Sequence, residues 1–313
     1  MNYTKNTVDE IIENVESQDA DLKTAFLAGV TKCLGSLQLY KGNKYSLEYE
    51  FKTEELCMEV YGLLKEVFDV DLELGFKTTE PRVYTISVSG EFANSILKTM
   101  GLSHYEDREL IIEDNTKYVE NISNLEKAKS YIQGVFVSNG SVYFPEGVDD
   151  NAGYHVELVF SEDYYAKAIQ GMLQKCGITL SYLDRESSYS LYGKSYQVVS
   201  DMLAFVRASN AVLDLSDINV NREVNNNLNR ENNFQMANLD KTITASSKHI
   251  YAIELLDKNI GIDNLDEKMA KVCHARLDNH DASLSELAKI VGLTKSSLNR
   301  VLEKILKKSK EFE

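Results

Sequence analysis

The sequence predicts an α+β protein in which a pseudo-symmetric, duplicated domain precedes an all-α domain. A short apolar segment with two glycines six residues apart occurs twice, so that Gly29 aligns with Gly134 and Gly35 with Gly140. Similar strand and helix patterns follow both copies, and these two observations predict the duplication. The all-α domain is predicted by two capped amphipathic segments near the C-terminus.

Each glycine segment reads as a helix that a second helix can approach closely. The copies occupy residues 27–36 and 132–141, and their glycines lack the Cβ that would keep two backbones apart. Both resemble the LAGLIDADG helix of homing endonucleases, in which an acid before the second glycine binds the catalytic metal. Leu34 and Asn139 occupy those positions here. Neither is a carboxylate, so the resemblance implies a LAGLIDADG-like scaffold that has lost its catalytic positions.

The pattern after each glycine segment reads strand, helix, strand, helix. Alternating apolar residues predict strands at residues 45–51, 83–89, 154–160 and 189–192. Apolar residues at helical spacing predict helices at residues 53–68, 91–100, 161–176 and 196–208. Pairing of the two units through their glycine-bearing helices would give one pseudo-symmetric domain with a saddle of sheets.

These patterns divide the chain into four parts. They are a first repeat at 1–102, a polar connector at 103–126, a second repeat at 127–218 and a helical domain at 219–313. Residues 219–233 hold eight Asn in fifteen, and composition alone favours a disordered linker about as much as a helix. A packed helix face is expected just beyond it, formed by Met236, Leu239, Ile243, Ile250, Ile253 and Leu256.

The net charge of −15 is unevenly distributed. Residues 1–218 hold 19 Lys and Arg against 35 Asp and Glu, whereas residues 219–313 hold 15 against 14. Residues 282–310 hold seven basic and two acidic side chains. This asymmetry indicates a polyanion contact at the C-terminal end only, with a solvated basic tail as the alternative. The acidic repeats should repel DNA, which leaves a protein partner or autoinhibition as their role.

The strongest local pattern predicts a helix-turn-helix at residues 283–307. Ser283 and Glu286 form a capping box, Gly292 permits the turn, and Thr294 can cap a second helix. The outer face of that second helix would supply DNA contacts, since Arg can read guanine, Asn can read adenine, and Ser or Lys can hold phosphate. The candidates are Thr294, Lys295, Ser296, Ser297, Asn299, Arg300 and Lys304. The alternative is a structural helical hairpin with a solvated face.

No other chemistry is indicated. The cysteines and histidines lack metal-ligand spacing, and no nucleotide-binding or nucleophile motif occurs, so neither a cofactor nor a metal is expected. The enzymatic alternative is a metal-dependent DNA endonuclease with displaced acids, for which Glu48, Glu50 and Glu157 are candidates. No apolar run is long enough for a membrane span, and the N-terminus is unlike a signal peptide, so the sequence predicts a cytoplasmic protein without membrane contact.

These parts in this order resemble the WhiA family of bacterial regulators over nearly the whole chain. The most specific matches to the family's signature are Asn226, Asn229, Arg230, Asn233, Ala237, Asn238, Lys241 and Thr242. The sequence departs from the signature at Asn225, where Arg is usual, and at Phe234, where Cys is usual. Residues 294–300 resemble the family's recognition-helix motif, with Ser297 in place of Gly.

The resemblance implies sequence-specific binding to double-stranded promoter DNA by a nucleoid-associated protein. The implied role is transcriptional control of cell division, chromosome segregation or sporulation, by a non-enzyme whose endonuclease-like domain has no nuclease activity. It also implies that the Asn-rich segment is ordered. Asn226, Asn229, Arg230, Asn233, Asn238 and Lys241 join the candidate DNA contacts on this ground.

Overall fold

The computed structural model describes residues 2–40, 44–106, 109–112, 119, 122, 124–145 and 153–312. The chain divides into two compact units, Met1–Arg222 (unit 1) and Glu223–Glu313 (unit 2). Within the described ranges, no helix is both long enough and apolar enough to cross a membrane.

Unit 1 contains two halves with the same order of elements. The first half contains α2 (Ala20–Leu34), β1 (Gly35–Tyr40), β2 (Lys44–Phe51), α3 (Glu54–Phe68), β3 (Glu73–Lys77), β4 (Val83–Ser89) and α4 (Gly90–Thr99). The second half contains α6 (Leu125–Asn139), β7 (Gly140–Tyr143), β8 (His155–Phe160), α7 (Asp163–Lys175), β9 (Ser181–Arg185), β10 (Ser188–Gly193) and α8 (Tyr196–Phe205). The duplicated α+β fold predicted from the repeated glycine segments is confirmed.

Each half forms a four-stranded antiparallel sheet, ordered β1-β2-β4-β3 in the first and β7-β8-β10-β9 in the second. Alternate residues of the central strands are buried, as Leu47, Tyr49 and Phe51 are in β2. The residues between them, including Glu48, lie on the opposite, open face because side chains alternate along a strand. The registers also correspond: Ser36 pairs with Glu48 in one half, and Ser141 pairs with Glu157 in the other.

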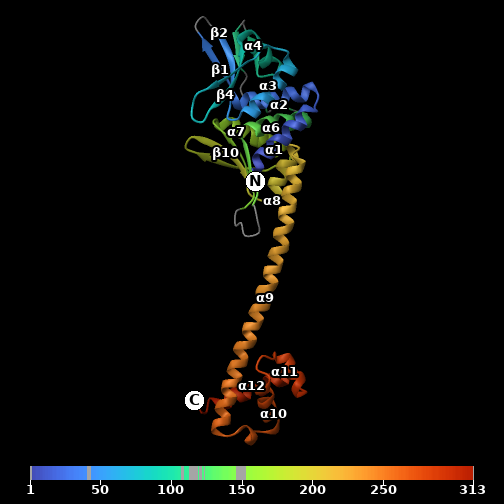
Figure 1. The fold of residues 1–313 in the computed structure, drawn as a ribbon, viewed down its shortest axis with the longest axis vertical. Coiled ribbons are helices and arrows are strands. Elements are labelled where there is room, and N and C mark those ends of the chain that lie inside the picture. The colour runs from blue at the N-terminus through green and yellow to red at the C-terminus, as the bar shows by residue number, and fades with distance from the viewer. Residues whose placement is uncertain are drawn as a thin grey trace. The chain divides into compact units, whose positions relative to one another are not determined.

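The halves join through α2 and α6, which lie side by side (Figure 1). Gly29 and Gly134 lie at this crossing, where neither has room for a Cβ. Gly35 and Gly140, which we expected to join the same contact, follow the ends of the two helices instead. A Cβ on Gly35 would lie 2.6 Å from the Thr31 carbonyl, and one on Gly140 would lie 2.5 Å from the Phe136 carbonyl. These two glycines therefore permit the turn from helix to strand.

Two parts of unit 1 have no counterpart among the predicted elements. α1 (Tyr3–Glu16) buries Thr7, Ile11, Ile12 and Val15 against the rest of the unit. The predicted connector begins with an antiparallel hairpin of β5 (Ser103–Glu106) and β6 (Glu109–Ile112). Much of the rest of the predicted connector, including residues 113–118, lies outside the described residues.

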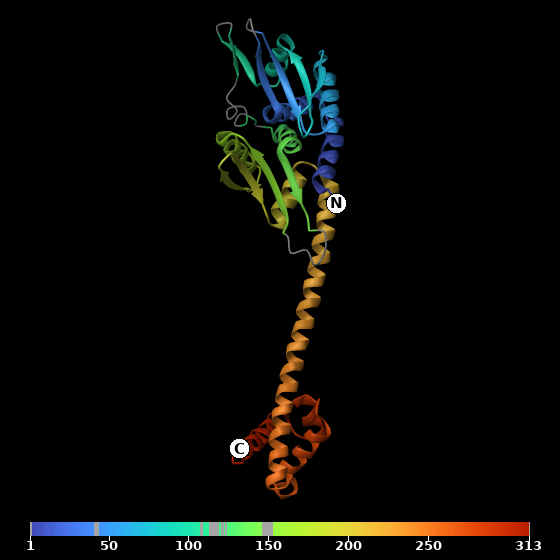
Figure 2. The ribbon, with the colours of Figure 1, turned by 60° about the vertical axis from the view of Figure 1, so that its left-hand side comes forward.

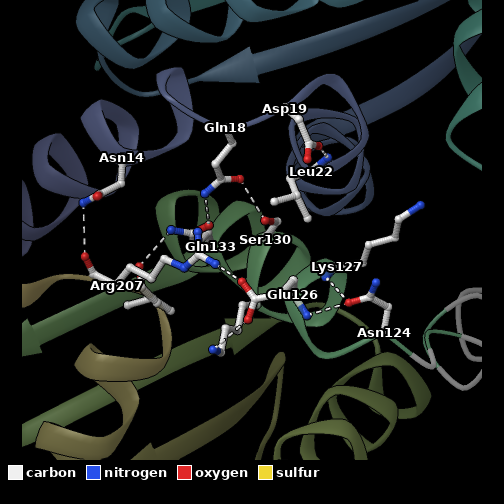
Figure 3. Close-up of polar contacts among 12 residues, drawn as sticks. Asn14, Gln18, Asp19, Leu22, Asn124, Glu126, Lys127, Ser130, Gln133 and Arg207 are labelled. Carbon is white, nitrogen blue, oxygen red and sulfur yellow. Dashed lines mark hydrogen bonds and ion pairs between the residues drawn. The ribbon is translucent and has the colours of Figure 1, made fainter.

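A polar network joins α1, α6 and the residues that follow α8 (Figure 3). Buried Gln133 accepts a hydrogen bond from Gln18 at 3.1 Å. Arg207 has a left-handed backbone, with φ of 63°, and its guanidinium pairs with Glu126. The carbonyl of Arg207 accepts from Asn14 Nδ2 at 3.1 Å. These contacts fix the turn from which α9 begins.

α9 (Ser209–Asn259) starts in unit 1 and continues into unit 2 (Figure 2). The Asn-rich segment is helical throughout, although its composition favoured a linker equally. Of the packed face that we expected on this helix, Ile253 and Leu256 are buried, whereas Met236, Leu239 and Ile243 are exposed. The expectation was therefore wrong for those three, because the unit's other helices cover only the last turns of α9. Those elements are η1 (Ile262–Asn264), α10 (Glu267–Asp278), α11 (Leu284–Val291) and α12 (Lys295–Ser309).

Candidate nucleic-acid interface

Local hydrogen bonds define the start and end of α11 as the sequence predicted. The Glu286 backbone N–H donates to Ser283 Oγ at 3.3 Å, and the Ser283 N–H donates to the Glu286 carboxylate at 2.8 Å. The bond from the Ser283 N–H favours the ionised carboxylate, and with a further contribution from the Ser283 side chain it holds the pKa of Glu286 below its usual range. Gly292 ends the helix with φ of 71°, in the left-handed region that glycine adopts without strain.

α12 begins three residues after Gly292, with Thr294 as its N-cap. The Thr294 hydroxyl accepts from the Ser297 N–H at 3.2 Å. The inner face of α12 is buried, as predicted, through Leu298, Val301, Leu302 and Ile305. It packs in one core with the apolar faces of α10 and α11. Burial of such a side chain contributes about 1.5–3 kcal/mol, so this core holds α12 against α10 and α11.

The opposite face of α12 presents polar and basic side chains. Thr294, Lys295, Ser296, Asn299, Arg300 and Lys304 are all exposed. Ser297 is half-buried, and its hydroxyl accepts from Lys268 Nζ on α10 at 3.1 Å. Asn299 Nδ2 donates to Glu303 at 2.9 Å within the helix. In the described part of the chain, neither Lys295, Arg300 nor Lys304 forms an ion pair, so their charges are available to a polyanion.

The candidates on α9 are exposed as well. Asn226, Asn229, Arg230, Asn233 and Lys241 follow one another at spacings that place them on one face of the helix, whereas Asn238 lies to its side. The fifteen helical steps from Asn226 to Lys241 span about 22 Å along the helix axis. Lys241 lies beside α12, because Lys241 and Leu306 of α12 line the same hollow.

A hollow of about 380 Å³ lies between α9 and α12 in unit 2. It is lined by Asp240, Lys241, Thr244, Ala245, Lys248, His249 and Leu306. Lys248 and Thr244 were not predicted, although Lys241 and Lys248 are seven residues apart and therefore share a helix face. That spacing was the available sequence signal. The structure thus adds a second exposed lysine beside α12.

Leu34 and Asn139, the two positions at which the sequence lacks an acid before the second glycine, lie at corresponding places in the two halves of unit 1. Leu34 is the last residue of α2 and Asn139 the last residue of α6, and both are half-buried. Neither supplies a carboxylate. Among the residues that the structure describes, no group of three or more His, Cys, Asp and Glu is arranged to hold a metal ion.

The acids proposed as replacements are engaged in ion pairs on the open sheet faces. Lys77 Nζ lies 2.8 Å from Glu48 and 2.7 Å from Glu50, and the hydrogen bonds that it donates to these carboxylates raise the pKa of Lys77. Arg185 lies 2.6 Å from Glu157 at the corresponding place in the second half. In each pair the carboxylate is engaged by a cation and is not free to bind a metal ion. The cation is likewise engaged and is not free to bind DNA phosphate.

Family comparisons cover most of the chain in three segments. The WhiA N-terminal LAGLIDADG-like domain matches residues 20–103, and the WhiA LAGLIDADG-like domain matches residues 128–225. The WhiA C-terminal HTH domain matches residues 228–308.

Relatives match over nearly their full length. A probable cell division protein WhiA of Clostridium acetobutylicum is 32% identical over 296 residues, which cover 92% of this chain and 91% of the relative. One from Staphylococcus saprophyticus is 27% identical over 300 residues, which cover 92% and 90%. The crystal structure of full-length WhiA from Thermotoga maritima has a similar fold, with a TM-score of 0.59 at 23% identity over 99% of this chain and 98% of that one.

Proposed function

Because the chain belongs to the WhiA family, we propose that it is a sequence-specific DNA-binding transcriptional regulator. Its relatives are named cell division proteins, which supports a regulatory role in cell division. Chromosome segregation and sporulation are the other processes that we propose it controls. The DNA site would be a double-stranded promoter sequence.

The observation that carries this proposal is the two-sided character of α12. Its apolar face is buried in the core of unit 2, while Lys295, Arg300 and Lys304 are exposed without an ion-pair partner among the described residues. A helix held rigidly by one face and cationic on the other fits the major groove of DNA. A solvated hairpin would also bury one face, but it would not need the excess of cations on the other.

The side chains of α12 divide into two roles in this proposal. Arg300 would read a base, since its guanidinium can donate two hydrogen bonds to guanine. Asn299 would read adenine after exchanging its bond to Glu303. Lys295 and Lys304 would contact phosphates, together with the hydroxyls of Thr294, Ser296 and Ser297. Asn226, Asn229, Arg230, Asn233, Asn238 and Lys241 on α9 would add further contacts along the backbone.

The test is DNA binding by the full chain and an Arg300→Ala variant. Sites would first be recovered by chromatin mapping and then measured as duplexes by fluorescence anisotropy. Loss of a base-reading arginine should weaken specific binding by about 1–3 kcal/mol, or about 5- to 150-fold, and relax the preference for one base. Lys258→Ala removes one exposed charge elsewhere in unit 2 and is the matched control. Wild-type affinity in a Lys295→Ala, Arg300→Ala double variant would show that α12 is not the reading helix.

We also propose that unit 1 has no nuclease activity. The support is the absence of acids at Leu34 and Asn139 and the ion pairs that occupy Glu48, Glu50 and Glu157. Incubation of the full chain with supercoiled plasmid and Mg²⁺ or Mn²⁺ should leave the plasmid intact. Metal-dependent nicking that disappears in Glu48→Gln or Glu157→Gln would instead support the endonuclease alternative.

The acidic unit 1 would bind a protein partner or restrain DNA binding by unit 2. Its charge opposes a broad DNA contact, because like charges raise the free energy of approach to a polyanion. A chain lacking residues 1–218 distinguishes the two roles. Tighter DNA binding by the shortened chain would indicate restraint, whereas unchanged affinity with lost regulation in cells would indicate a partner.

A further inference from the structure

A buried arginine holds the loop that precedes the helix-turn-helix. Arg276 on α10 is 1% exposed. Its Nη1 donates to the carbonyl of Ala282 at 2.7 Å, to the carbonyl of Asn279 at 3.3 Å and to Ser246 Oγ on α9 at 3.3 Å. In the described part of the chain, no Asp or Glu forms an ion pair with this guanidinium.

These bonds span the whole connection between α10 and α11. Asn279 is the C-cap of α10, and Ala282 immediately precedes Ser283, the N-cap of α11. Ser246 also donates to the carbonyl of His280 in the same loop. Side chains of α9 and α10 thus bind three carbonyls of a four-residue loop. The loop carbonyls are only partly buried and can also bind water, so the bonds to fixed side chains of α9 and α10 serve to hold the loop in one conformation.

The arrangement is an inefficient way to stabilise a core. A buried cation without a counter-charge loses solvation free energy that hydrogen bonds to neutral groups recover only in part. Burial lowers the pKa of Arg276, and burial with the Arg276 charge lowers the pKa of His249 to about 4. The charged guanidinium therefore raises the free energy of the folded state around it. An apolar side chain of similar length would fill the same space without that cost.

We propose that Arg276 is a positioning residue that sets where α11 begins and thereby orients α12 for reading DNA. The inference rests on the proposed DNA-binding function. α11 starts directly beyond the bound carbonyl of Ala282, and the α11–turn–α12 pair is fixed internally by its caps and core. A shift at the start of α11 would therefore be transmitted to α12. Recognition requires side chains held to within about 0.5 Å, so a small shift is enough to weaken it.

The experiment compares full-length Arg276→Met and Arg276→Lys with Val272→Ala. Val272 lies on the same helix and is fully buried, and its truncation removes core packing while keeping the loop bonds. Three quantities are measured: the thermal midpoint, hydrogen–deuterium exchange of amides 280–286 without DNA, and affinity for a duplex site selected by the wild type and for a scrambled duplex.

For Arg276→Met we expect a thermal midpoint at or above that of the wild type. Loop exchange should be at least about 10-fold faster, specific affinity at least about 10-fold weaker, and binding to the scrambled duplex unchanged. For Arg276→Lys, loop exchange and specific affinity should lie between those of the wild type and of Arg276→Met, because the lysine ammonium can still donate to a loop carbonyl. Val272→Ala should lower the midpoint and, at temperatures where it is folded, retain specific affinity.

Wild-type exchange in Arg276→Met overturns the proposal, as does faster exchange with unchanged specific affinity. A midpoint that falls as far as that of Val272→Ala also overturns it, because the arginine would then be a stability residue. If the methionine variant does not fold, Arg276→Gln, which keeps a shorter neutral donor, must show the same increase in loop exchange. Failure of the wild type to select any site would refute DNA binding itself, while the exchange data would still decide the loop geometry.

Discussion

Gly29 on α2 and Gly134 on α6 each have their side-chain space filled by the backbone of the other helix. A Cβ on Gly29 would lie 2.3 Å from the carbonyl oxygen of Tyr131, and one on Gly134 would lie 2.1 Å from that of Phe26. Both distances are far inside van der Waals contact with rigid backbone atoms. The two halves of the duplicated fold are thus joined at a point that tolerates only glycine.

Gly29→Ala or Gly134→Ala should therefore destabilise unit 1 strongly. The helices must separate to admit a methyl group, and the apolar residues around the crossing lose contact. Overpacking of this kind usually costs about 1–3 kcal/mol, and because the obstacle is backbone we expect about 3 kcal/mol or more. Urea unfolding of the full chain measures the effect.

Gly62→Ala and Gly171→Ala are the matched controls, because these helical glycines have no atom within 4 Å of an added Cβ. Alanine there should stabilise the protein by about 0.5–1 kcal/mol, through helix propensity. If Gly29→Ala behaves like Gly62→Ala, the close crossing does not exist in solution.

Elements with one buried face could be predicted from the sequence. The strand predicted at 45–51 is β2 (Lys44–Phe51), and the helix predicted at 53–68 is α3 (Glu54–Phe68) with Thr53 as its cap. Edge strand β3 (Glu73–Lys77) was missed although Leu74 and Phe76 alternate with their neighbours, because five residues with a central glycine are a weak strand pattern. α1 did carry a signal, since Val8, Ile11, Ile12 and Val15 are at helical spacing.

The parts of the candidate interface that depend on contacts between residues close in sequence could be predicted. Caps and turns act over three or four residues, so Ser283, Gly292 and Thr294 could be assigned directly. Arg276 could not, because its partner Ser246 is thirty residues away and the sequence gives no pairing for a lone arginine. The Asn-rich helix was ambiguous for a related reason. Propensity disfavours it locally, and contacts at its two ends stabilise it.

One of those end contacts is an acid that caps α9 from another helix. Ala208 precedes α9 and has no side-chain oxygen, and the Glu10 carboxylate of α1 accepts from the N–H groups of Asn210 at 2.7 Å and Ala211 at 3.2 Å. Glu10→Gln should cost about 1 kcal/mol, because the amide has one acceptor and no charge to oppose the helix dipole. This corresponds to a fall of about 2–4 °C in the thermal midpoint of unit 1.

Calorimetry of the full chain checks the Glu10 prediction. Glu13→Gln, an exposed acid on the same helix, removes the same charge without touching α9 and should leave the midpoint unchanged. Equal shifts in the two variants would assign the effect to net charge rather than capping.

Unit 2 should lose stability between pH 6.5 and about 4. Burial, followed by the charge of Arg276, lowers the pKa of His249 to about 4, from an ordinary value near 6.5. In this window the unfolded chain binds a proton that the folded chain does not, so stability rises with pH and falls on acidification. The shift sets an upper bound of about 3 kcal/mol. Below about pH 4 this contribution is fully lost.

His249→Gln should remove that pH dependence. Exchange of amides in α10 to α12, corrected for the intrinsic effect of pH, measures the opening of unit 2 in both proteins. His274→Gln is the control, since His274 is exposed and pairs with Asp263 at 3.3 Å. A wild type and His249→Gln variant with parallel pH profiles would mean that His249 titrates as in the unfolded chain.

The lysines beside α12 should contribute to the salt dependence of DNA binding. Lys241 and Lys248 line the hollow between α9 and α12, and in the described part of the chain neither forms an ion pair. A lysine that neutralises a phosphate releases a counterion, so its removal should reduce the slope of log K against log salt by about 1. Anisotropy titrations from 50 to 200 mM salt, about the range over which such slopes are resolved, measure this for Lys241→Ala and Lys248→Ala. Lys258→Ala should retain the wild-type slope, and the same slope in Lys241→Ala would exclude a phosphate contact by this face of α9.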